Sequence, residues 1–123
     1  MQFDIDSQGK FTDIFLELRD IILSFDSIRE QRNTKQTAYY SDYSAICFLR
    51  ANQQKLTLSL AQGAKLHEIY PFLEGEGKIV RHIYFYDDSI VDRELISNII
   101  EKSITITLER YELKRLKNSR LFH

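Results

Sequence analysis

Leu56-Thr57-Leu58-Ser59-Leu60 is the stretch that decides the fold, because its apolar and polar residues alternate without exception. Successive side chains of a β-strand point to opposite faces, so this period of two predicts a strand with one buried face and one wet face. A polar turn at residues 51–55 separates it from the short apolar run 45–50, which we expect to be the preceding strand. Consecutive strands joined by tight turns predict an antiparallel meander.

Two further segments extend the expected sheet. Residues 79–86 alternate with the same period, which places Arg81 on one face and His82 and Tyr84 on the other. Residues 28–42 are polar but extended, and their Thr and Tyr residues favour a strand. We therefore expect at least four strands.

Helical periodicity flanks the expected sheet. Residues 11–26 carry apolar side chains on one helical face, whereas the residues before Gly9 suit a loop. Asp92 is a good N-cap for a second long helix, which we extend through the β-branched stretch 104–108 because the apolar register continues. A short helix is expected at 64–73. The shared core is predicted to contain Phe15, Leu18, Ile22, Leu58, Ile83, Ile96 and Ile100.

These elements predict an α+β fold, in which an antiparallel β-sheet packs against the N-terminal and C-terminal α-helices. We expect a single domain over residues 1–123, with a core at about 11–107 and a basic helical extension at 108–123. The composition, 43% hydrophobic and 28% charged, is sufficient for such a core. Cys47 lies in the apolar run, so we expect a buried, reduced thiol.

The charge and hydropathy of the sequence limit the expected cellular location of the protein and its expected binding partners. A net charge of −1 argues against a nucleic-acid binder, and no stretch is apolar enough for a membrane span. The chain opens with polar and acidic residues rather than a signal peptide, so we expect a cytoplasmic protein. Residues 1–26 hold six acids and two bases, whereas residues 109–123 hold five bases and two acids. The two ends could attract within one chain or between two copies, which makes a homodimer one hypothesis.

The sequence contains no motif typical of an enzyme. Gly75-Glu76-Gly77-Lys78 lacks the spacing of a phosphate loop, and no spaced Cys, His and carboxylate motif surrounds His82. We therefore expect a binding module. Asp13, Glu17 and Asp20 lie on one stripe of the first helix, at spacings of four and three. This ridge suits a loosely held hard cation, and the alternative is a solvated helix face.

The order of the expected helices and strands, together with several short motifs, resembles that of a known protein family. An amphipathic helix with Leu18-Arg19-Asp20-Ile21-Ile22 precedes a tyrosine hairpin and the stretch Leu58-Ser59-Leu60-Ala61-Gln62-Gly63-Ala64. The most telling part is Gly77-Lys78-x-x-Arg81-His82-Ile83. Over residues 11–107 the chain resembles the YdhG-like family of small bacterial domains of unknown function. It differs from the family pattern at Thr34-Lys35-Gln36-Thr37, where family members often have an aromatic-Gly-x-Pro stretch.

The resemblance implies the same α+β fold, and one family member is described as a frataxin-like intracellular iron chaperone. It therefore implies weak iron binding, for which Asp13, Glu17 and Asp20 are the candidate ligands. A small-molecule or anion pocket near residues 75–86 is the alternative, formed by Lys78, Arg81, His82 and Tyr84. A protein-interaction domain that dimerises is the third hypothesis.

Overall fold

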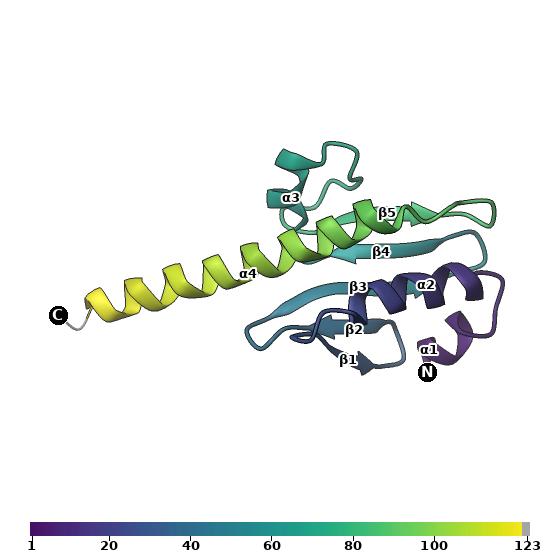
Figure 1. Cartoon of the computed structure of the whole chain (residues 1–123), viewed down its shortest axis with the longest axis horizontal. Helices are drawn as coiled ribbons and strands as arrows, with labels where there is room; N and C mark the ends of the chain where they lie inside the picture. The colour runs from purple at the N-terminus through teal and green to yellow at the C-terminus, as the bar shows by residue number, and fades with distance from the viewer. Residues whose placement is uncertain (122–123) are drawn as a thin grey trace.

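A computed structural model describes residues 1–121 of the chain, with side chains through residue 119. It confirms the α+β class: one antiparallel sheet with helices before and after it (Figure 1). The last two residues of the expected 108–123 extension lie outside the described part. The elements, in chain order, are α1 (Gln2–Asp6), α2 (Thr12–Leu23), β1 (Arg29–Arg32), β2 (Thr37–Tyr40), β3 (Ala45–Ala51), β4 (Leu56–Leu60), α3 (Gly63–Ile69), β5 (Arg81–Phe85) and α4 (Arg93–Leu121).

The five strands form a meander in which spatial order equals sequence order, as the tight turns predict. Each neighbouring pair is antiparallel. Side-chain oxygens close three of the turns: Asn33 accepts backbone N–H groups before β2, Ser41 does so before β3, and Asn52 does so before β4. Such local hydrogen bonds favour turns over continued strands, and they set the register of each hairpin.

Burial is greatest on one face of the sheet, although Ala38 on the opposite face of β2 is also buried. Leu56, Leu58 and Leu60 are fully buried, whereas Thr57 and Ser59 between them are only partly covered. Figure 1 shows α2 and α4 lying side by side across the sheet. The two short helices lie on the same side, because the Phe3 ring of α1 packs against Phe15 of α2 and because α3 contacts α4. The predicted core is confirmed, with Ile83 partly buried at its margin.

Helix α4 begins where the sequence predicts. The Asp92 carboxylate accepts the backbone N–H of Leu95 at 3.1 Å, which is a normal N-cap. The β-branched stretch 104–108 is helical, as predicted. Buried Ser103 and Thr107 donate their hydroxyl hydrogens to the carbonyl oxygens four residues earlier, at 2.7 and 2.8 Å. Polar side chains of this helix can therefore face the protein core, because their hydroxyl donors are satisfied.

Beyond Thr107 the helix leaves the sheet. Figure 1 shows its C-terminal half projecting past the ends of the strands, far from α1. The described residues after Thr107 are exposed. Within the described residues, the acidic segment 1–26 and the basic residues 109–119 therefore make no ion pair with each other, and pairing between two copies stays a prediction.

The N-terminal loop expectation holds for residues 7 and 8 but is wrong for residues 2–6, which form α1. This helix is held by long-range contacts: the Gln2 amide donates to the Ala51 carbonyl at 2.9 Å, and the Asp6 carboxylate accepts the Ala51 N–H at 3.2 Å. Burial raises the pKa of Asp6, although the hydrogen bonds from Gln2 and Ala51 oppose that shift. A five-residue helix has little stability alone, so its sequence carries no strong signal.

Removal of core side chains tests this packing. Ile22→Ala in α2 and Ile96→Ala in α4 are each expected to lower the free energy of unfolding by about 2–5 kcal/mol, because both side chains are buried between helix and sheet. Ile90→Ala is the matched control, since Ile90 is 93% exposed and its loss should cost under about 0.5 kcal/mol. Urea unfolding followed by circular dichroism measures all three. A loss for Ile22→Ala or Ile96→Ala no larger than the control would contradict the fold.

Candidate functional site

A groove lies beside the overhanging half of α4. Its volume is about 590 Å³, within the usual range for small-molecule sites. Three parts of the chain form it: the β2–β3 turn, the start of α3, and about three turns of α4. We call this hollow the basic groove, and its lining residues are Tyr43, Ser44, Gln62, Lys65, Thr107, Arg110, Tyr111, Leu113, Lys114 and Lys117.

Two contacts position the walls of the basic groove. The Arg110 Nη1 donates to the Gln62 Oε1 at 3.2 Å, which ties α4 to the residue preceding α3. The rings of Tyr43 and Tyr111 lie with centroids 4.3 Å apart and planes tilted by 32°. The β2–β3 turn and α4 are therefore joined across the groove by an aromatic contact, a favourable arrangement for two rings.

A smaller hollow of about 170 Å³ continues from the basic groove. It shares Gln62, Lys65 and Arg110 with the groove and adds Lys78 and Glu68. The backbone brings Lys78 here because the N–H of Ala64, in the first turn of α3, donates to the Ile79 carbonyl at 2.7 Å. The two hollows together collect basic side chains from α3, from the loop before β5, and from α4.

The charges of the basic groove are of one sign. Lys65, Arg110, Lys114 and Lys117 line it, and its lining residues include no carboxylate. None of these four cations makes an ion pair with another described residue, whereas Arg19, Arg29, Arg32 and Arg93 each do. Like charges that converge without internal partners attract anions, and Arg and Lys are the usual ligands of phosphate groups.

The four residues of the alternative pocket predicted from the sequence lie in three different places in the structure. Lys78 lines the smaller hollow, whereas Arg81 donates to the carbonyls of Gly77 and Val80 and so closes the loop before β5. His82 and Tyr84 point away from the helices, because they pair with Ser59 and Thr57. The four residues therefore do not form one pocket.

His82 has a structural environment on the open face of the sheet. Its Nδ1 lies 2.9 Å from the Ser59 hydroxyl, and its ring stacks on Tyr84. The Lys55 ammonium lies 3.8 Å from the centre of the Tyr84 ring. Burial lowers the pKa of His82, with smaller contributions from Lys55 and Arg81. This shift favours the neutral ring, which serves as a cross-strand hydrogen-bonding partner of Ser59.

The glycines of the resembling stretches have backbone roles at this edge. A Cβ on Gly63 would overlap the backbone nitrogen of Arg81, so only glycine lets α3 begin against β5. Gly75 has a φ of 122°, a conformation that other residues rarely adopt, and it lies against the His82 ring. The stretch from Gly63 to His82 thus holds α3 and its loop on the sheet.

The sequence-predicted carboxylate ridge keeps its alignment on α2 but is largely engaged. The Arg93 guanidinium donates to Asp20 at 2.8 Å and to Glu17 at 3.5 Å, which joins α2 to the start of α4. Asp13 is exposed one turn away. Among residues 1–121, no group of three His, Cys, Asp or Glu side chains is arranged to hold a metal ion.

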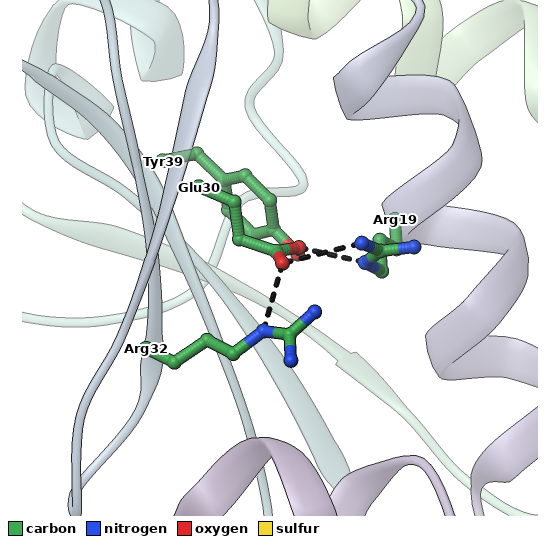
Figure 2. A network of polar contacts seen from close by, with 4 residues as sticks. All are labelled: Arg19, Glu30, Arg32 and Tyr39. Carbon is green, nitrogen blue, oxygen red and sulfur yellow. Dashed lines mark hydrogen bonds and ion pairs between the residues drawn. The ribbon is translucent and has the colours of Figure 1, made fainter.

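A half-buried polar network lies between α2 and the edge of the sheet (Figure 2). The Glu30 carboxylate accepts hydrogen bonds from Arg19 at 2.7 and 3.2 Å, from Arg32 at 3.0 Å and from the Tyr39 hydroxyl at 3.0 Å. The Arg32 guanidinium also lies 3.4 Å from the centre of the Phe3 ring. The Glu30 carboxylate is bound by three side chains of the same chain, so this network holds α1, α2 and the edge strand together.

Cys47 is fully buried, as predicted. Burial raises the pKa of its thiol, which removes the thiolate needed for nucleophilic or redox chemistry.

The residues of the basic groove include several that sequence reasoning missed. Tyr43, Gln62 and Lys65 come from a turn and a helix start, and no local pattern links them to α4. A signal did exist in α4: Arg110, Lys114 and Lys117 are spaced by four and three, which places three bases on one helical face.

Comparisons with known proteins add no name to this site. No family model matches the chain. No curated protein matches it, and no solved structure does. The resemblance to the YdhG-like family therefore stays a prediction. Within the described part of the chain, no helix is both long and apolar enough to span a membrane.

The hydrogen-bond network around Glu30 predicts how the stability of the protein depends on pH. Burial alone would raise the pKa of Glu30, but the hydrogen bonds from Arg19, Arg32 and Tyr39 outweigh it and hold the pKa below 4.5. A depressed pKa contributes stability that is present above the unfolded value and is lost as pH falls through the folded value. Glu30→Gln should therefore cost about 1.5–3 kcal/mol of unfolding free energy at pH 7.

The cost of Glu30→Gln should shrink as the pH is lowered through the range below 4.5, where the wild-type carboxylate becomes protonated. Urea unfolding of both proteins between pH 3 and pH 7 is the measurement. Glu101→Gln, an exposed substitution of the same kind on α4, is the control and should show no such difference. A pH-independent cost for Glu30→Gln would contradict the charge-assisted network.

Proposed function

We propose that this chain is a non-catalytic binding module whose basic groove takes a phosphate-bearing anion. The observation that carries the proposal is the convergence of Lys65, Arg110, Lys114 and Lys117 in one hollow without a lining carboxylate. Three separate segments supply these side chains and the opposing wall, so the hollow is a product of the tertiary fold.

A binding role is favoured over catalysis by the kinds of side chain present. The groove is lined by bases, amide and hydroxyl groups, two tyrosines and a leucine. Its lining has neither a His, Cys, Asp or Glu side chain nor a nucleophile beside a general base, which acyl transfer or hydrolysis normally requires. Arg110 is the best-oriented anion ligand, because Gln62 holds its guanidinium.

The expected affinity is low for an anion alone. The four cations are exposed, and exposed ion pairs contribute at most about 1 kcal/mol each. Four such contacts give about 4 kcal/mol, which corresponds to a dissociation constant of about 1 mM. Binding should weaken with added salt, because solvent-exposed charges are screened.

Titration with pyrophosphate, followed residue by residue by NMR at low salt, tests this function. Shifts should concentrate at the β2–β3 turn, at residues 62–65 and at residues 107–117. Arg110→Gln combined with Lys114→Gln should weaken binding by up to about thirtyfold, since it removes two charged contacts of at most about 1 kcal/mol each. The control is Lys35→Gln combined with Lys102→Gln, which removes two exposed lysines away from the groove. Equal weakening in both double variants, or shifts spread evenly over all lysines, would contradict the proposal.

Weak iron binding by α2 is the second candidate, supported by the resemblance and by the alignment of Asp13, Glu17 and Asp20. Arg93 competes with any cation there, because it already contacts Glu17 and Asp20. Arg93→Gln should therefore strengthen ferrous iron binding, and combining Asp13→Asn, Glu17→Gln and Asp20→Asn should remove it. Anaerobic calorimetry measures both. Iron binding that is unchanged by either set of substitutions would exclude this ridge as the site.

A further inference from the structure

The basic groove contains an aromatic surface that an inorganic anion would not use. Tyr43 is 47% exposed and Tyr111 is 41% exposed, although their rings already contact each other. Both residues line the same hollow as Arg110 and Lys65. Exposed aromatic surface beside converging cations matches a ligand with two chemically different parts, one planar and apolar and one anionic.

Backbone hydrogen bonds and a helix position the two tyrosines of the groove. Tyr43 lies in the turn between β2 and β3, where the Ser41 hydroxyl oxygen accepts the N–H groups of Tyr43 and Ser44 at 3.3 and 3.4 Å. The Ser41 N–H also donates to the Ser44 carbonyl at 2.9 Å. Tyr111 projects from a regular stretch of α4. A preorganised aromatic platform loses little entropy when a planar group stacks on it, so it contributes more to affinity.

The cationic part lies directly beside this platform. Lys114 follows Tyr111 by three residues and Arg110 by four on α4, so it neighbours both side chains on the helix surface. Gln62 anchors the Arg110 guanidinium at 3.2 Å, and Lys65 lines the groove from α3. The lining lacks a carboxylate, which favours a dianionic phosphate over a neutral or cationic ligand.

We propose that the ligand of the basic groove belongs to the nucleoside monophosphate class, with its base stacked on the outward face of the Tyr43–Tyr111 ring pair and its phosphate held by Arg110 and Lys65. The inference rests on the proposed function and adds the planar half of the ligand. A volume of about 590 Å³ is sufficient for one nucleotide. Stacking on aromatic side chains tolerates any base, so the platform selects for a base rather than for one particular base.

Two ligands that differ only in the base distinguish the contribution of the tyrosines from that of the cations. Adenosine monophosphate should bind about tenfold more tightly than ribose 5-phosphate, because stacking of one base adds that much. In NMR titrations, the ring protons of Tyr43 and Tyr111 should shift with adenosine monophosphate but hardly with ribose 5-phosphate. Tyr43→Leu combined with Tyr111→Leu should abolish the preference, so that adenosine monophosphate and ribose 5-phosphate bind this variant equally. Tyr86→Leu is the control, since Tyr86 is 47% exposed and does not line the groove.

The outcomes distinguish this inference from the function on which it rests. Equal affinity for adenosine monophosphate and ribose 5-phosphate, with both weakened by loss of Arg110 and Lys114, would overturn the nucleotide proposal and keep the anion site. Absence of binding by ribose 5-phosphate, pyrophosphate and adenosine monophosphate alike would overturn both. Tight binding of a single-stranded oligonucleotide without measurable binding of the monophosphate would overturn the inference in favour of nucleic acid. The melting temperature of each variant checks that the fold is intact.

Discussion

The packing of α4 against the inner face of the sheet is the interaction on which the rest of this structure depends. The strands bury Leu56, Leu58 and Leu60 on one side only, and α2 and α4 cover that side together. Ile96, Ile99 and Ile100 of α4 are at most 2% exposed, so this contact supplies much of the apolar burial. The sheet is shorter than α4, and the remainder of the helix therefore continues into solvent with its charges unburied (Figure 1).

This mismatch in length creates the basic groove. Where α4 leaves the sheet, the β2–β3 turn and the start of α3 flank it, and Tyr43 and Gln62 contact its side chains. The position of α3 depends in turn on Gly63, which permits a close approach to the backbone of Arg81. Gly63 and Arg81 of the resembling stretches therefore affect the groove indirectly, because they position the segment that carries Lys65 and Lys78.

Local periodicity predicted the fold well and the site poorly. The alternation at 56–60 and 79–86 and the helical spacing at 11–26 report directly on which face is buried, so strands, helices and most of the core followed from them. Helix α1 was missed because long-range contacts to Ala51 hold it. The groove was missed because Tyr43, Lys65 and Arg110 are far apart in sequence and meet only in the tertiary structure. Glu17 and Asp20 formed a legible stripe, but no local pattern showed that Arg93 would pair with them.

The central claim is that α4 stays helical past the sheet and closes the groove against the β2–β3 turn. Nuclear Overhauser spectroscopy of the free protein measures this directly. The structure predicts cross-peaks between the ring protons of Tyr43 and Tyr111, whose centroids lie 4.3 Å apart, together with helical chemical shifts through Lys117. Random-coil shifts from Leu108 onward, with no contact between the two rings, would contradict the account.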